Sequence, residues 1–300
     1  MYLVKPSPLA LEGSNLPDAS ASEYSATATY DVGSVVKVSS ATPVHTYKSL
    51  ISPNVGNAPA TSKAAWEDLG PTNRWAMLDT MNSSQSTSSG SIVATVSGAM
   101  IDTVVLMNVV ASRITIEQFY GNDLVEALTS SLVDLHTEDI VDWYSYFVTG
   151  LSVRSALVES GWRKLPYAVF RVTIYPLTGQ AACGMLVAGE KKQLGDTGFG
   201  VSAGILDYSR KSTDEFGNTY LSQGAYAKKA SVPVQMDNAN INDAYALLAS
   251  VRSKPTLWNC NNNDSGGFEP LLIFGFARDF GVVIPGPVVS DCNLEIEGLI

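Results

Sequence analysis

The chain has 300 residues, of which 45% are hydrophobic and only 16% are charged, whereas about a quarter of the residues in a typical soluble domain are charged. Its formal net charge of −10 argues against a nucleic-acid partner, because phosphate contacts need clustered Lys and Arg. The same charge disfavours attachment to anionic lipid. A chain of this length can form two domains with real cores, and its low-charge, Ser/Thr-rich composition is typical of a surface that packs against other protein.

The sequence shows no targeting motif and no cysteine spacing typical of disulfides or metal sites. Residues 1–11 lack the apolar stretch of a signal peptide, and no run of about 18 apolar residues is long enough to span a bilayer. Cys183, Cys260 and Cys292 are widely spaced, which predicts neither a disulfide framework nor a zinc site. We therefore expect buried free thiols, folding in a reducing cytoplasm and no membrane insertion.

The first 60 residues are predicted to form an N-terminal extension with short strands. Residues 30–38 (YDVGSVVKV) and 45–51 (HTYKSLI) alternate in short runs between turn residues. A connector rich in Pro, Gly, Asn and Ser follows at residues 52–63.

Two tryptophans then flank a Gly-Pro turn. Trp66 stands beside the acidic pair Glu67-Asp68, and Trp75 lies in the run RWAMLD, which is predicted to be a strand that packs Trp75 in the core. Trp66 can either pack in the core or contact a ligand or another subunit, and the sequence leaves this open. The Ser/Thr-rich connector at residues 82–91 is expected to face solvent or a partner.

Residues 61–190 are predicted to form an antiparallel, jelly-roll-like β-sandwich. SIVATV places Ile92, Ala94 and Val96 on one face, and SRITIEQ does the same for Ile114 and Ile116. TVVLMNVV is continuously apolar, as in a central strand covered on both faces. The remaining predicted strands are DIVDWYSYFV (139–148), AVFRVTIYPL (168–177) and residues 124–135, where a strand is favoured over a helix.

Residues 191–300 are predicted to form a smaller β domain with one packed α-helix at about residues 240–254. Asn240 is the predicted N-cap, and Pro255 prevents continuation of the helix. The apolar residues recur with helical spacing and form one face that comprises Ile241, Ala244, Tyr245, Leu248 and Val251.

Several segments resemble structural proteins encoded among the tail genes of tailed bacteriophages. The resemblance lies in WEDLGPTNRWAMLD, DWYSYFV and the stretch from LVAGEKKQLGDTGFG through DYSRK and DEFGN to YAKK, and it covers most of the chain beyond Ala60. It implies a galactose-binding-like or lectin-like sandwich, followed by a β domain with one helix similar to the tail-tube and distal-tail fold. The chain departs from the pattern at Gln223-Gly224-Ala225, where the group usually has an Arg before the YAK segment.

A mixed-charge cluster follows the glycine-rich stretch LGDTGFGVSAG. It contains Asp207, Arg210, Lys211 and Asp214, with Glu215 next to the EFGN turn. Such a loop can adapt to a neighbouring subunit, with Arg–carboxylate pairs setting the register of the contact. The alternative is an ordinary solvated hairpin.

The motifs do not favour an enzyme. GVSAG matches the G-x-S-x-G elbow around Ser202, but that elbow needs a strand–turn–helix and a later histidine, and both histidines, His45 and His136, precede it. Neither histidine has the spacing of a zinc ligand set. The stretch NNNDSGG resembles a calcium loop only in composition. Acidic pairs such as Asp139/Asp142 can serve a glycosidase but also arise by chance in acidic chains. We expect no catalytic residues, cofactor or metal.

The leading hypothesis is a non-enzymatic structural component of a bacteriophage virion, at the distal tail or baseplate, folded in the host cytoplasm. It would assemble with itself in a symmetric ring and with other tail proteins. A second hypothesis is a carbohydrate- or receptor-binding module of the tail tip that binds a host surface glycan, and a third is a glycan-degrading enzyme. The candidate partner or glycan contacts are Trp66, Asp207, Arg210, Lys211 and Asp214.

Overall fold

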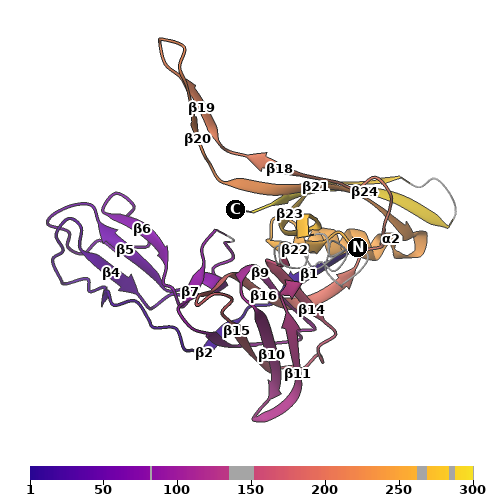
Figure 1. Ribbon diagram of the computed structural model, residues 1–300, viewed down its shortest axis with the longest axis horizontal. Helices are drawn as coiled ribbons and strands as arrows, with labels where there is room; N and C mark the ends of the chain where they lie inside the picture. The colour runs from indigo at the N-terminus through magenta and orange to yellow at the C-terminus, as the bar shows by residue number, and fades with distance from the viewer. Residues whose placement is uncertain (82, 135–151, 262–268, 284–287, 300) are drawn as a thin grey trace, which may run out of the picture.

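The computed structural model describes residues 1–81, 83–134, 152–261, 269–283 and 288–299 (Figure 1). The fold is mainly β, with large antiparallel sheets and, in the described residues, a single α-helix. This confirms the predicted class of a β-sandwich with one small helix. None of the helices in these ranges is both long and apolar enough to cross a membrane.

In its described residues, the first half of the chain contains short strands, the strands of the sandwich and one 3-10 helix. They are β1 (Tyr2–Pro6), β2 (Ala10–Ser14), β3 (Ser22–Glu23), β4 (Val35–Val38), β5 (His45–Ser49), β6 (Trp66–Pro71), η1 (Ala76–Leu78), β7 (Ser86–Ser88), β8 (Ile92–Gly98), β9 (Thr103–Val110), β10 (Arg113–Tyr120), β11 (Asp123–Ser131) and β12 (Val133–Asp134).

The second half contains the longest strands and the helix. Its elements are β13 (Ser152–Val153), β14 (Ala156–Ser160), β15 (Ala168–Tyr175), β16 (Ala181–Gln193), β17 (Asp196–Thr197), β18 (Ser202–Asp207), β19 (Arg210–Thr213), β20 (Thr219–Ser222), β21 (Tyr226–Asp237), η3 (Asn238–Asn240), α2 (Ile241–Val251), β22 (Thr256–Asn259), η4 (Glu269–Leu271), β23 (Leu272–Val283) and β24 (Val289–Gly298).

One large sheet runs through the molecule in the order β14-β9-β16-β1-β22-β23-β24-β21-β17, with β7 paired to β16 and β18 paired to β21. A second sheet has the order β11-β10-β15-β8-β2 and faces part of the large one. The core between them contains Ile92, Ile114 and Ile116 from the second sheet and Val104 and Leu106 from β9. The strands predicted from SIVATV, SRITIEQ, AVFRVTIYPL and residues 124–135 are therefore confirmed, although residue 135 lies outside the described ranges.

The helix packs on the part of the large sheet that contains β21 to β24. Ala244 and Val251 are buried there with Trp258, and Leu248 is half-buried against the same cluster. Tyr245 is 66% exposed, so its predicted place on the packed face is wrong. The helix packs only a narrow stripe of side chains against the sheet, and Tyr245 lies outside that stripe.

The ends of the helix also differ from the prediction. Asn240 occupies the N-cap position, but its side chain makes no capping hydrogen bond. The helix ends at Val251, several residues before Pro255, because Arg252 adopts ψ 130° and leaves the helical region.

The other face of the large sheet has its own core. Successive side chains of a strand point to opposite faces, so Leu3 joins the helix cluster while Tyr2 and Val4 lie on the reverse side. There they pack with residues such as Met107 and Phe274. The carboxylate of Glu269 accepts hydrogen bonds from the Ser155 N–H, at 2.6 Å, and from the Ser155 hydroxyl, at 2.8 Å, and so joins η4 to the start of β14.

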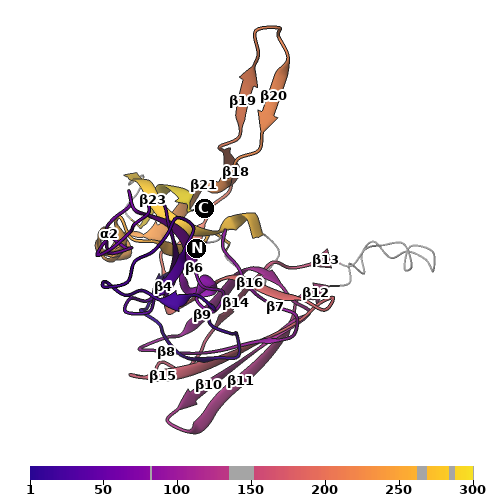
Figure 2. The ribbon, with the colours of Figure 1, turned by 90° about the vertical axis from the view of Figure 1, so that its left-hand side faces the viewer.

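Two parts stand apart from the sandwich. Strands β3 to β6 form a separate small sheet, seen at the left of Figure 1. Strands β19 and β20 pair only with each other, and together they form a hairpin that projects beyond β18 and β21 (Figures 1 and 2). We call residues 208–225 the arm.

Continuous structure crosses both predicted domain boundaries. The small sheet extends from Ser22 to Pro71 and so crosses residue 60, while β16 runs through residue 190. β1 is also more than part of an extension, because it lies in the large sheet between β16 and β22. These pairings join residues far apart in the sequence, which local patterns do not reveal.

The structure of the segment around Trp75 also differs from the predicted strand. RWAMLD is a turn followed by the 3-10 helix η1, not a strand, and it buries Ala76 and Met77 while Trp75 is only half-buried. Within the connector at 82–91, Ser86 is buried in β7 and accepts a hydrogen bond from the Met77 N–H at 3.0 Å. The predicted strand DIVDWYSYFV lies outside the described residues.

Candidate interaction site

Three of the five predicted contact residues lie along the arm, and a fourth lies at its root. Asp207 ends β18 just before the arm, Arg210 and Lys211 begin β19, and Asp214 starts the turn at the apex. Trp66 belongs to β6 of the small sheet, a separate part of the molecule (Figure 1).

Asp214 builds the turn at the apex. Its Oδ1 accepts hydrogen bonds from the backbone N–H of Phe216, at 2.9 Å, and of Asn218, at 2.7 Å, while its Oδ2 accepts one from the Asn218 amide at 2.8 Å. The Asn218 side chain, followed by these backbone groups, lowers the pKa of Asp214. Gly217 has φ +85°, which a glycine adopts without steric cost. Asp214 therefore has a structural role within the arm.

Hydrogen bonds also fix the conformation of the arm at its root. The Ser209 N–H donates to Asp207 Oδ1 at 2.8 Å, and Ser209, through its side chain first, lowers the pKa of Asp207. The Gly224 N–H donates to the Ser209 hydroxyl at 3.0 Å. A Cβ on Gly224 would lie 2.5 Å from the Tyr208 carbonyl oxygen, so the glycine in the Gln223-Gly224-Ala225 departure allows the two strands to approach closely.

Arg210 and Lys211 are the cations of the arm. Both are exposed, and in the described part of the chain neither side chain makes an ion pair. Their charges are thus available to carboxylates of another molecule. Because these side chains are solvated, we expect them to affect register and association rate more than affinity.

The arm also exposes bulky apolar side chains that the sequence analysis did not single out. Phe216 at the apex is 90% exposed and Leu221 is 80% exposed, with Tyr208 and Tyr220 more than half exposed. Every described residue of β19 and β20 is exposed, so the hairpin contributes no core of its own. The available signal was the apolar content of FGNTYL, within a segment otherwise rich in turn residues and charges.

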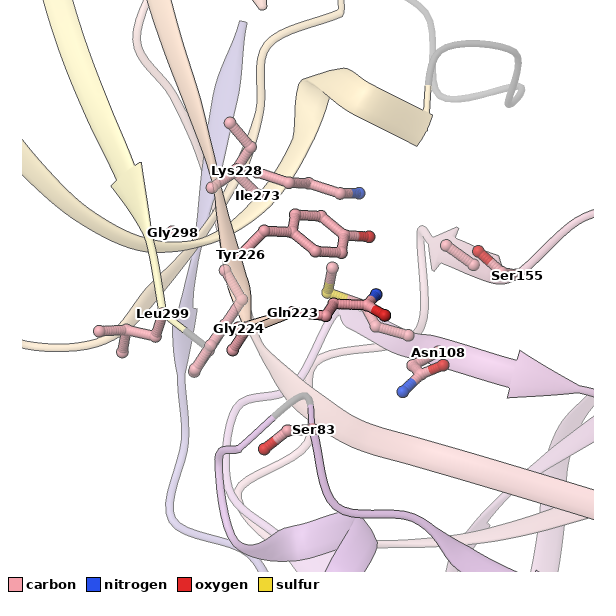
Figure 3. A pocket seen from close by; sticks show the side chains of 14 residues that line it. Ser83, Asn108, Ser155, Gln223, Gly224, Tyr226, Lys228, Ile273, Gly298 and Leu299 are labelled. Atoms are coloured by element: carbon pink, nitrogen blue, oxygen red, sulfur yellow. The ribbon is translucent and has the colours of Figure 1, made fainter. Parts of the chain in front are cut away.

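A cavity of about 410 Å³ opens beside the root of the arm. Met107 and Phe274 from the reverse-face core form apolar parts of its wall, and Gln223, Tyr226 and Lys228 come from the arm root and β21. Figure 3 shows the Gln223, Tyr226 and Lys228 side chains extending toward the side of the cavity where Asn108 and Ser155 lie.

Lys228 alone carries a charge among the described residues that line the cavity. Its Nζ donates to the Glu269 carbonyl oxygen at 2.8 Å and to the Leu272 carbonyl oxygen at 3.4 Å. Burial lowers the pKa of Lys228, and the nearby charge of Glu269 opposes this effect. An anionic group entering the cavity would restore some of the solvation that the ammonium has lost.

Trp66 does not present a face to a ligand. It is 2% exposed, and its indole packs edge-on against Tyr24 and Tyr30, with ring centroids 6.0 Å and 5.3 Å away. Its Nε1–H donates to the Asn57 carbonyl oxygen at 2.9 Å. Of the two roles left open by the sequence, the structure shows core packing.

The other chemical motifs do not form a site. Ser202 begins the exposed strand β18 and is not followed by a helix. His45 lies 3.0 Å from both carboxylate oxygens of Asp68 on the neighbouring strand β6, a pairing across strands that the sequence spacing concealed. No group of three or more His, Cys, Asp and Glu side chains able to hold a metal is found in the described ranges. His136, Asp139 and Asp142, and residues 262–267 of NNNDSGG, lie outside them.

Neither a scan against protein-family models nor a search of curated proteins found a match to this chain.

Proposed function

We propose that the protein is a non-enzymatic structural component of a bacteriophage virion, at the distal tail or baseplate, that assembles through its arm. The resemblance of the sequence to tail structural proteins supports the virion part of this proposal. The projecting arm carries the assembly part, because it is an exposed two-stranded ribbon with bulky apolar side chains at its apex and on β20.

The arm leaves its bulkiest apolar side chains unburied in the isolated chain. An isolated two-stranded hairpin is marginally stable in water, and full burial of a Phe or Leu side chain contributes about 1.5–3 kcal/mol. The arm forgoes that contribution at both Phe216 and Leu221 in the isolated chain. A protein partner that covers these side chains would recover it, and the cations Arg210 and Lys211 would then orient the contact.

The burial of Trp66 disfavours the alternative of a glycan-binding module. Its best candidate residue, Trp66, is buried in the small sheet, so stacking on a sugar ring would require that sheet to unfold. No other predicted contact residue is aromatic.

The proposal is tested by locating the protein and measuring its assembly. Mass spectrometry of purified virions should detect the chain at a copy number that is a small multiple of the tail symmetry. Light scattering of the purified protein, alone and with neighbouring tail proteins, should detect a ring of defined order. Absence from virions, together with a strictly monomeric state both alone and in the presence of neighbouring tail proteins, would refute the proposal.

A further inference from the structure

We infer that the arm apex of one copy inserts into the cavity at the arm root of a second copy, so that Phe216 occupies the apolar part of that cavity and Glu215 faces Lys228. This inference rests on the proposed function and adds to it the identity of the partner, the two contacting surfaces and the head-to-tail sense of assembly.

The apex presents an aromatic ring and a carboxylate side by side. Phe216 is 90% exposed, and its backbone is held by Asp214 through the N–H hydrogen bond of 2.9 Å. Glu215 is exposed and has no side-chain partner among the described residues. A rigid turn that displays such a pair loses little conformational entropy on binding, which favours affinity.

The cavity presents the complementary pair. Tyr226 and Leu299, which are 58% and 38% exposed, supply accessible apolar surface over a wall formed by the buried Met107 and Phe274. Lys228 supplies a positive charge that is already partly desolvated. The nearby Glu269 carboxylate is already occupied by the Ser155 N–H and hydroxyl and by the Ala156 N–H. The volume of the cavity, about 410 Å³, falls within the roughly 300–1,000 Å³ range of pockets that enclose compact ligands.

The geometry excludes the chain's own apex as the occupant. The apex lies nine residues from Asp207, which at about 3.3 Å per residue corresponds to roughly 30 Å along the arm. The cavity is lined by Gln223 and Gly224 at the opposite end of the same arm and by the adjoining Tyr226, so the apex cannot reach it while β19 and β20 remain paired. The apex and the cavity therefore meet only between molecules.

A second copy is the occupant favoured by this arrangement, because one chain carries both complementary surfaces. Apex and cavity are different patches, so the contact is heterologous and propagates from copy to copy until a ring closes. Each docked apex would also touch the root of the receiving arm, which links successive arms mechanically.

Sedimentation velocity over a range of concentrations tests the inference. Phe216→Ser should weaken self-association by at least about tenfold, because it removes a central aromatic anchor. Phe199→Ser is the matched control, since Phe199 is fully exposed but lies outside the arm and the cavity lining; it should behave as wild type. The melting temperatures of both variants should match that of wild type, since neither ring is buried.

Cross-linking identifies the two surfaces. Cys183, Cys260 and Cys292 are all buried, so a short bis-maleimide should react mainly with introduced thiols. A mixture of Phe216→Cys chains with Ser83→Cys chains should give a cross-linked dimer, because Ser83 lies in the cavity lining. A mixture of Phe199→Cys with Ser83→Cys chains should give only background.

The outcomes separate this inference from the proposed function. Wild-type rings that persist in Phe216→Ser, or equal cross-linking in the two mixtures, would overturn the apex-in-cavity contact while leaving a virion role intact. A wild type that stays monomeric at every concentration would overturn it too, and virion mass spectrometry would then decide the proposed function by itself.

Discussion

At the scale of single residues, Trp66 has a structural role that its neighbours in the sequence conceal. Its acidic neighbours Glu67 and Asp68 are exposed, yet the indole itself is buried in a small cluster with Val36 and Ala65, against which three tyrosine side chains pack. The Nε1–H bond to the Asn57 carbonyl also holds the connector against β6. One side chain thus accounts for much of the apolar contact inside the small sheet.

Replacement of Trp66 should measure that role. We expect Trp66→Ala to lower the free energy of unfolding of the small sheet by about 3–5 kcal/mol, the usual cost of a large buried aromatic truncation. Amide hydrogen exchange of β4, β5 and β6 measures the effect locally. Trp66→Phe is the control and should cost less. A stable Trp66→Ala protein that loses binding to a defined saccharide would contradict core packing and revive the glycan-binding hypothesis.

At the scale of elements, α2 is an amphipathic helix with a narrow packed stripe. Ala244 and Val251 are buried, Leu247 and Leu248 are half-buried, and Tyr245 points to solvent. The helix covers the same face of the large sheet that the second sheet covers farther along. It therefore closes a core that the strands alone would leave open.

Leu248 and Tyr245 form a matched pair for testing this packing. Leu248→Ala should lower the free energy of unfolding by about 2 kcal/mol, the low end for leucine truncation, because the side chain is only half-buried. Tyr245→Ala should change it by less than about 0.5 kcal/mol. Urea denaturation measures both. Equal effects of the two substitutions would show that the helix packs with a different face from the one described.

At the scale of the whole molecule, the large sheet is continuous and contributes to the core, whereas the arm is exposed to solvent. The large sheet continues from the sandwich to the helix-covered part through β1, which pairs with β16 on one side and β22 on the other. The arm begins at the hydrogen bond that the Tyr208 N–H donates to the Ala225 carbonyl oxygen, at 3.0 Å. Beyond this root, the arm does not cover the rest of the molecule.

Removal of the arm should therefore separate folding from assembly. Replacing residues 209–224 by Asn-Gly, a two-residue hairpin connection, should leave the melting temperature within a few degrees of wild type. The same protein should remain monomeric under conditions in which wild type assembles. Calorimetry and light scattering measure the two properties. A large loss of stability would show that the arm supports the body, contrary to its exposure.

Local patterns in the sequence were sufficient for much of the secondary structure. Ile92, Ala94 and Val96 alternate as a strand must when one face is buried, and the unbroken apolar run of β9 correctly indicated burial on both faces. The helix was found from its 3.6-residue period. These features depend on backbone geometry over a few residues, which is why a single sequence determines them.

Tertiary structure alone decided which segments share a sheet and which side chains are covered. β1 pairs with strands about 190 and 255 residues away in the chain, Trp66 is buried beside exposed acids, and Phe216 is exposed although it is strongly apolar. Burial is a property of long-range contacts, whereas periodicity is a property of neighbours. Apolar side chains such as Phe216 and Leu221 are therefore left in solvent on the arm, where no second layer of the described structure covers them.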